Sequence, residues 1–201
     1  MSFTAAKVYS ELNFSEHLVI GHPYYPSRPA FLLVRRGWIK VKEQIHTHDL
    51  GPYSIILIDS NSVYEILDFS PNIKVILIAY DRDFVEQLNF KFNRLKAYSG
   101  IRSKFKNSYV ADKEEFTSIW KNLENLKYYI ESEETNEYLI EVIETFFTAL
   151  IYQFGNIINR NRRLSKDLMS RSQEIVLDFI KLVSNQYLEE KSVDFYAQKM
   201  M

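Results

Sequence analysis

Six short runs rich in β-branched and aromatic residues follow one another between residues 31 and 80. Turn-forming residues such as glycine, proline, asparagine and aspartate separate these runs. Strands at short, even spacing are typical of an antiparallel barrel or sandwich, because tight connections suffice to join neighbours. We therefore predict strands at Phe31–Arg36, Trp38–Lys42, Ile45–His48, Ser54–Ile58, Val63–Leu67 and Ile73–Tyr80.

The six runs differ in how they alternate. Ile39–Lys42 alternates apolar and charged residues, as a strand with one solvent-facing side does. Ile55–Ile58 and Val75–Ile78 are apolar throughout, which predicts strands that are buried on both faces. A small barrel with helices packed against it accounts for this mixture. Before the barrel, residues 1–29 are predicted to form an irregular arm with one short strand at Leu18–Ile20.

Helical patterns follow the strands. Asp81 can cap a short helix that extends through Leu88, and a further strand is expected near Tyr109. Asp112 and Glu115 have the spacing of a capping box, in which each side chain accepts a backbone N–H of the first helical turn. The next helix then presents one apolar face made of Phe116, Ile119, Trp120, Leu123, Leu126 and Ile130.

The longest predicted helix covers Glu137–Asn159, and the basic stretch Asn159–Lys166 is interpreted as a linker. At 100° per residue its apolar side chains sweep roughly 220°, which is wider than packing on one core requires. We therefore predict that a second copy of the chain covers part of this face. The alternative is that the arm or Asn89–Ala111 covers it. The predicted dimer interface consists of Leu139, Ile143, Phe146, Phe147, Leu150 and Phe154.

The last thirty residues have the pattern of helix, short turn and helix start. Ser170 and Gln173 have capping-box spacing, and Ser192 stands as the N-cap of a second helix. Between them, Ile175, Phe179, Leu182 and Val183 recur on one helical face.

The run Ser192-Val-Asp-Phe-Tyr-Ala197, preceded by Phe179–Val183, resembles the start of the AraC-type DNA-binding domain. That domain has two helix-turn-helix units, so the resemblance implies that this chain is truncated before the first recognition helix. The start of the domain is assigned to Ser192, Val193, Phe195, Tyr196 and Ala197. Phe31–Gly37, Leu50–Ile58 and Ala79–Phe84 are similar in layout to the cupin-like sensor domain that precedes it in that family.

These observations predict an α+β protein with an antiparallel cupin-like β-barrel, an α-helical pair and a partial helix-turn-helix. The expected domains are the arm and sensor barrel (1–111), a helical dimerisation region and linker (112–165), and the start of the DNA-binding domain (166–201). The resemblance implies the ligand-sensing and dimerisation portion of a sequence-specific transcriptional regulator. Its expected partners are DNA for the full-length protein only, a small-molecule effector and a second copy of itself.

Composition excludes several other classes. The chain has no cysteine, hence no disulfide, thiolate metal site or cysteine nucleophile. A net charge of −1 does not indicate a basic nucleic-acid binder. The first 25 residues lack the apolar core of a signal peptide, and no run has the length of a membrane span. We therefore expect a cytoplasmic protein with no membrane partner.

His46 and His48 form the one pair with metal-like spacing, because residues two apart on a strand point to the same side. Metal-binding cupins also supply a glutamate shortly afterwards and a later histidine, and Asp49–Tyr53 has no glutamate while no histidine follows His48. We therefore predict no metal, no cofactor, no catalytic residues and no enzyme activity. A metal-dependent cupin enzyme and a dimerisation module without a ligand remain the alternatives.

A small ligand would bind in the barrel interior. Tyr24, Arg35, Trp38 and Tyr64 are the candidates for orienting it, because each has polar atoms and lies on or beside a predicted strand. The large apolar residues of the strands predict that the cavity is small or filled.

Overall fold

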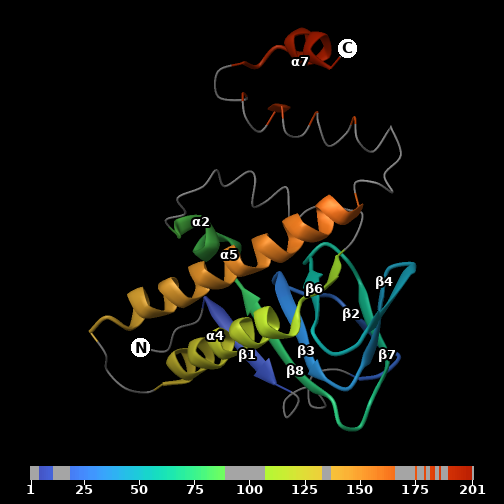
Figure 1. The fold of residues 1–201 in the computed structure, drawn as a ribbon, viewed down its shortest axis with the longest axis vertical. Helices are drawn as coiled ribbons and strands as arrows, with labels where there is room; N and C mark the ends of the chain where they lie inside the picture. The colour runs from blue at the N-terminus through green and yellow to red at the C-terminus, as the bar shows by residue number, and fades with distance from the viewer. Residues whose placement is uncertain are drawn as a thin grey trace.

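The computed structural model describes residues 5–10, 19–88, 107–132, 137–165 and 190–200, together with residues 175, 179, 182, 183 and 186. It has an α+β fold in which two antiparallel sheets lie beside a pair of helices (Figure 1). The predicted class is therefore confirmed.

Nine strands make up the two sheets in the described part of the chain. The first sheet has the order β1-β8-β3-β6-β9 and the second has the order β2-β7-β4-β5, and every pairing is antiparallel. All six predicted strands are confirmed to within two residues at each end. The strands are β1 (Ala6–Ser10), β2 (Pro23–Tyr24), β3 (Ala30–Arg36), β4 (Ile39–Glu43), β5 (His46–Leu50), β6 (Ser54–Ile58), β7 (Tyr64–Phe69), β8 (Lys74–Tyr80) and β9 (Ser108–Val110).

The five-stranded sheet forms the middle layer of the molecule. In β3, Phe31 and Leu33 belong to the core shared with the helices, whereas Leu32 and Val34 belong to the core between the two sheets. The same alternation splits β6 and β8 between the two cores. The prediction of strands buried on both faces is thereby confirmed, because successive side chains of these strands enter different cores.

The predicted closed barrel is wrong. Among the described residues, the two sheets share no strand pairing, so they form an open sandwich. The edge strands β1 and β9 of one sheet make no backbone ladder with the edge strands β2 and β5 of the other. Side chains join the sheets at the β5–β9 edge instead, as the contacts of His48 below illustrate.

The predicted irregular arm contains a strand that the sequence pattern did not reveal. β1 pairs with β8 along Ala6–Ser10 and buries Ala6 and Val8 in the core shared with the helices. Five residues with only two small inward side chains give a weak alternation signal. Of the short strand predicted at Leu18–Ile20, Leu18 lies outside the described residues, and Val19 and Ile20 are not in a strand.

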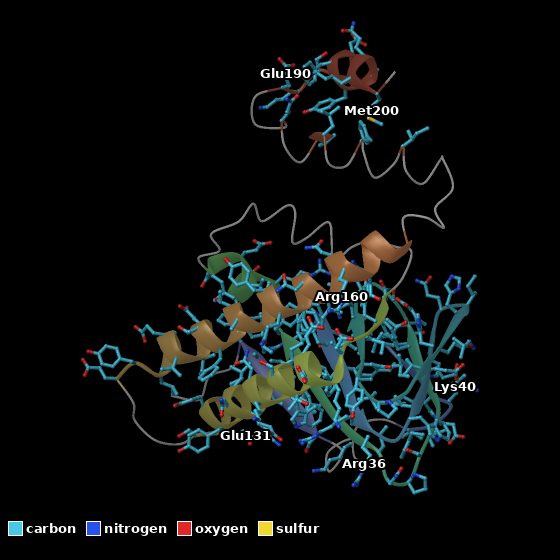
Figure 2. All side chains as sticks on the ribbon, in the orientation of Figure 1. Arg36, Lys40, Glu131, Arg160, Glu190 and Met200 are labelled. Atoms are coloured by element: carbon cyan, nitrogen blue, oxygen red, sulfur yellow. The ribbon has the colours of Figure 1, made fainter. Side chains whose placement is uncertain are left out.

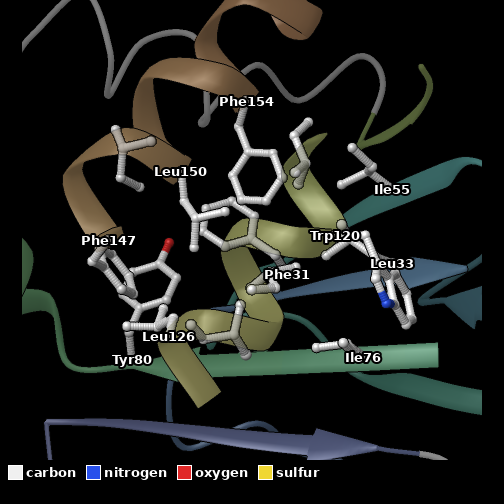
Figure 3. Packing of buried hydrophobic residues seen from close by; sticks show 14 of the residues in the cluster. Phe31, Leu33, Ile55, Ile76, Tyr80, Trp120, Leu126, Phe147, Leu150 and Phe154 are labelled. Atoms are coloured by element: carbon white, nitrogen blue, oxygen red, sulfur yellow. The ribbon is translucent and has the colours of Figure 1, made fainter. Parts of the chain in front are cut away.

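Two helices cover the outer face of the five-stranded sheet: α4 (Lys113–Glu131) and α5 (Leu139–Ser165). Figure 3 shows aromatic and aliphatic side chains of both helices packed onto the strands. The ring centroid of Phe154 lies 4.3 Å from that of Phe31, and the ring of Phe147 meets that of Tyr80 edge-on.

This packing changes the interpretation of the predicted dimer interface. Ile143, Phe147, Leu150 and Phe154 are buried within a single chain, and Leu139 and Phe146 are partly buried against the same core. In the structure these residues therefore belong to the core that the sheet, α4 and α5 form within one chain. Dimerisation itself stays a prediction, and it requires another surface.

Three predicted helix starts are placed correctly, but their capping bonds are not formed. Asp112, Asp81 before α2 (Arg82–Gln87) and Ser192 before α7 (Val193–Lys199) occupy N-cap positions without a side-chain cap hydrogen bond. Asp112 and Glu115 pair with Arg160 instead, and Asp81 pairs with Arg28. These aspartate and glutamate side chains thus form ion pairs with arginines, whereas the sequence predicted that they would accept hydrogen bonds from backbone N–H groups. The box predicted at Ser170–Gln173 lies outside the described residues.

The predicted linker at 159–166 is also wrong, because α5 continues to Ser165. Arg160 is held by two carboxylates, and the Asn161 amide donates to the Ile157 carbonyl, so the helix is supported where the sequence suggested an end. Of the helices in the described ranges, none is long and apolar enough to cross a membrane.

Candidate functional site

The structure does not gather the four predicted ligand residues in one place. Tyr24 and Tyr64 lie opposite each other in the β2–β7 pairing, with Tyr64 buried and Tyr24 44% exposed. Arg35 lies on the helix side, where its guanidinium is 5.3 Å from the centre of the Trp120 ring. Trp38 is 44% exposed. Only Tyr64 contributes to a buried polar site.

That site is centred on the carboxylate of Glu43, which is 8% exposed. Its Oε1 accepts hydrogen bonds from the Tyr64 hydroxyl at 2.9 Å and from the Asn107 amide at 2.8 Å. Its Oε2 lies 3.0 Å from Nε2 of His48. We call Glu43, His48, Tyr64, Asn107 and Ser108 the Glu43 cluster. Both carboxylate oxygens are therefore engaged within the protein.

The cluster orders its own donors and acceptors. An ionised carboxylate can only accept, so Nε2 of His48 donates to Glu43, and Nδ1 of the same ring lies 3.3 Å from the Ser108 hydroxyl oxygen. The Tyr64 hydroxyl donates to Glu43 and accepts the backbone N–H of Asp59 at 2.9 Å. Strands β4, β5 and β7, and Asn107 just before β9, thus meet at one carboxylate.

Strand alternation explains why these side chains converge. Ile39, Val41 and Glu43 are the buried positions of β4, so Glu43 continues the apolar row that faces the other sheet. His48 sits two residues before the buried Leu50 on β5, and Tyr64 two residues before the buried Ile66 on β7. Glu43 was not among the predicted site residues, although it continues the alternation of Ile39 and Val41 and is therefore expected to face inward.

The electrostatics favour an ionised Glu43. Burial by itself raises the pKa of this carboxyl group, but hydrogen bonds from His48, Tyr64 and Asn107 outweigh it, so the net pKa is lowered. Burial also raises the pKa of Tyr64 far above its usual value, and the neighbouring Glu43 charge raises it further. At neutral pH the site therefore holds a charged acceptor and a neutral phenol that donates to it.

His46 and His48 are not arranged as a metal site in the described residues. His46 is exposed, whereas His48 is turned toward Glu43 and Ser108. No group of three or more histidine, aspartate or glutamate side chains in the described ranges has the geometry to hold a metal ion. Metal-binding cupins carry a glutamate after their histidine pair. In this chain the carboxylate beside His48 comes from Glu43, which precedes both histidines. The absence of bound metal remains a prediction.

The core between the sheets is filled by side chains rather than by a ligand-sized cavity. Leu32, Val34, Ile39 and Ile56 are each at most 2% exposed there. Two hollows lined by described residues lie elsewhere, both against α5. The larger has a volume of about 310 Å³ and is open to solvent, beside Leu88, Glu141, Glu144, Thr145 and Thr148.

The C-terminal fragment has its own small contact. The Tyr196 side chain of α7 is 7% exposed, its hydroxyl donates to the Glu190 carbonyl at 2.6 Å, and its ring meets the Phe179 ring edge-on. Of the other residues assigned to this motif, Phe195 is half-buried, whereas Ser192, Val193 and Ala197 are exposed. Tyr196 therefore links α7 to Phe179 and Glu190.

Neither a family model nor a curated protein matches this chain. Solved structures similar to it include ToxT from Vibrio cholerae, at 11% identity over 99% of this chain and 71% of that chain, with a TM-score of 0.43. The AraC-like transcriptional activator CuxR matches 96% of this chain and 71% of its own, at 8% identity and a TM-score of 0.44.

Oxalate decarboxylase from Bacillus subtilis is also similar, at 14% identity over 46% of this chain and 29% of that chain, with a TM-score of 0.29. All three TM-scores lie below 0.5, so these likenesses do not establish a family for the chain.

Proposed function

We propose that this chain is the sensing and dimerisation portion of a sequence-specific DNA-binding transcriptional regulator of the AraC type. In this proposal, residues 1–111 sense a signal, residues 112–165 dimerise, and residues 166–201 begin the DNA-binding domain. The sandwich and the helical pair would then set the relative position of two DNA-binding domains on their half-sites.

The observation that carries the proposal is the local structure of the Ser192-Val-Asp-Phe-Tyr-Ala197 run. Ser192 precedes a helix, and Tyr196 packs on Phe179 of the preceding segment, as expected for the first contact of a helix-turn-helix unit. Val193 is 80% exposed. The proposal accounts for this exposure, because a following recognition helix packs on the outer side of such a helix.

The sensing role is supported less directly, by the Glu43 cluster and the filled core between the sheets. A packed interior favours a small effector or none at all. A thermal-shift screen distinguishes these cases, because a ligand at 100 times its dissociation constant adds about 2.7 kcal/mol of stability. Metal analysis of the purified protein separates the regulator from the metal-dependent cupin enzyme.

The dimerisation role requires a surface other than the buried face of α5. Tyr128 near the end of α4 and Tyr138 and Ile140 at the start of α5 are 58–62% exposed. Tyr128 belongs to α4 and Ile140 to α5, two helices that contact each other, and Tyr138 directly precedes α5. We propose that these exposed residues belong to the interface, because large apolar side chains at the surface commonly mark a contact between chains.

A dimer-dependent reporter tests the proposal. The 201-residue chain is joined to the amino end of a DNA-binding domain that represses its reporter only as a dimer. We expect repression with the wild-type chain, and at least about tenfold weaker repression with Ile140→Glu, because an interfacial charge that loses its water costs more than 1.4 kcal/mol. Asn156→Glu is the matched control, since Asn156 is also exposed on α5 and is already polar.

Light scattering on the same variants at micromolar concentration gives an independent measurement. A wild-type chain that is monomeric throughout and does not repress would overturn the dimerisation part of the proposal. Repression that survives Ile140→Glu would move the interface away from the start of α5.

A further inference from the structure

One segment, Asn107–Glu115, is anchored by charged groups at both of its ends. At the start, Asn107 donates to Glu43 at 2.8 Å and Ser108 contacts His48 at 3.3 Å. At the end, Arg160 lies 3.1 Å from Asp112 and 2.7 Å from Glu115. Figure 2 labels Arg160 on α5, facing the start of α4. The segment therefore joins the four-stranded sheet to the C-terminal part of α5.

Between these anchors the backbone of the segment is fixed to the five-stranded sheet. β9 pairs with β6 over Ser108–Val110, and the Leu57 N–H donates to the Asn107 carbonyl at 2.8 Å. The Ala111 N–H donates to the Tyr53 carbonyl at 3.0 Å. Only Asp112 separates Ala111 from the first residue of α4.

Tyr53 braces the junction between β9 and α4. Its backbone has a φ of 67°, in the left-handed region that side chains rarely adopt, and its N–H donates to Val34 at 2.7 Å. In this conformation its carbonyl faces Ala111 and its ring lies edge-on to Phe116, with 5.4 Å between the centroids. The strained residue thus holds the end of β9 and the first turn of α4 to the same sheet.

We propose that Asn107–Glu115 is a coupling segment, which links the state of the Glu43 cluster to the position of the last turns of α5. The Asn107 amide and the Glu43 carboxylate form its input, and the Arg160 ion pairs form its output. When the hydrogen bond between Asn107 and Glu43 is lost, the start of β9 becomes more mobile. Because Asp112 and Glu115 follow within a few residues, their ion pairs with Arg160 then weaken as well. Coupling between two such sites is reciprocal, so loosening Arg160 also loosens the Glu43 cluster.

The coupling is a property of the sensing and dimerisation portion alone. Its use as a relay to a DNA-binding domain rests on the proposed function, since the chain leaves α5 toward residues 166–201. The two statements can fail separately. Hydrogen exchange tests the coupling without DNA, and the reporter tests the function.

The experiment is amide hydrogen exchange, measured by mass spectrometry on the full 201-residue chain. Glu43→Gln removes the charge of the carboxylate while keeping the shape of the side chain. Asn107→Ala removes the amide that connects Glu43 to the start of β9. We expect either variant to speed exchange about tenfold in residues 157–163 of α5, besides a local effect in β4 and β9. In the reciprocal test, Arg160→Met is expected to speed exchange at Leu57 and Ala111, whose N–H groups bond to the segment and to Tyr53.

Lys42→Met is the matched control for the input. Lys42 is next to Glu43 on β4 but pairs with Glu65 at 3.2 Å on the opposite, solvent-facing side of the strand. We expect this variant to leave exchange in α5 unchanged. Lys127→Met plays the same part for the output, because it removes the Lys127–Glu131 ion pair of α4 and does not touch the coupling segment.

The double variant Glu43→Gln/Arg160→Met decides whether the two sites act as one. If they are coupled, exchange in residues 157–163 is no faster than in the faster single variant. If the two sites are independent, the acceleration in the double variant equals the product of the two single accelerations to within about twofold. That result would overturn the proposal. An equal acceleration in β8, which pairs with β1 and β3 rather than with β9, would also overturn it, because it would indicate global loss of stability.

Discussion

At the residue scale, Gly37 leaves the least room for a side chain among the glycines that the structure describes. It connects β3 of one sheet to β4 of the other, with a φ of 75°. A Cβ atom there would lie 2.9 Å from the backbone Cα of Ile73 and would also collide with the Ser70 hydroxyl, which accepts the Trp38 N–H. Gly37 therefore fixes the crossing between the sheets.

We expect Gly37→Ala to lower the free energy of unfolding by about 2 kcal/mol or more, from the left-handed φ and the clash together. Gly155→Ala is the matched control, because a Cβ there meets no atom within 4 Å and the residue lies inside α5. That substitution is expected to add up to about 1 kcal/mol of stability. Urea unfolding of both variants measures the difference, and a neutral Gly37→Ala would contradict the clash.

Some contacts of the Glu43 cluster could be predicted from the sequence, and others could not. The inward position of Glu43 follows from the alternation of β4, and that of Tyr64 from the alternation of β7. The contact with Asn107 could not be predicted, because it joins residues 64 positions apart and depends on where β9 pairs. Arg35 was a candidate for orienting a ligand between the sheets, but it continues the row of Phe31 and Leu33 on β3 and therefore lies on the helix side, over Trp120.

At the element scale, the helix α5 separates residues that stabilise one chain from those that could join two. Ile143 and Phe147 are at most 1% exposed in the core, whereas Ile140 is 58% exposed on the same helix. Ile143→Glu and Phe147→Glu are expected to lower stability by at least about 3 kcal/mol, because each buries a charge without a partner. Ile140→Glu is expected to stay within about 0.5 kcal/mol of the wild type when both are compared as monomers.

Thermal unfolding at low protein concentration checks this contrast, with circular dichroism confirming that each variant folds. A Phe147→Glu variant as stable as the wild type would show that the apolar face of α5 is not the core contact seen in the structure. Equal losses in Ile140→Glu would show that Ile140 packs within its own chain.

The sequence predicted correctly those helices and strands that follow from a local pattern. It predicted poorly the features that depend on pairing between strands far apart in the chain. The six strands between residues 30 and 80 follow from composition and turns, and α4 follows from a single apolar face. Whether the sheet closes depends on the edge strands β1 and β2, which have five and two residues and carry little pattern. On α5, the sheet and α4 cover Ile143, Phe147, Leu150 and Phe154 within one chain, and coverage of the helix by a second chain stays a prediction.

At the scale of the whole molecule, the chain of 201 residues is expected not to bind DNA with sequence specificity. Specific recognition requires a helix that delivers side chains to base edges in the major groove. The run that resembles the AraC-type domain lies at Ser192 and in α7, and the chain has a net charge of −1. Arg160, from the basic stretch at 160–163, is engaged by Asp112 and Glu115.

The remaining basic side chains can contact phosphates only, for which dissociation constants of about 10⁻⁴–10⁻⁶ M are typical at physiological salt. Repeated selection from a pool of random duplexes measures this directly, since it requires no knowledge of a target. We expect no enriched sequence, and weak binding that disappears as salt rises because counterion release drives it. An enriched sequence that the chain then binds with nanomolar affinity in a gel shift would contradict the prediction, since it would mean that residues 1–201 already contain a complete reading surface.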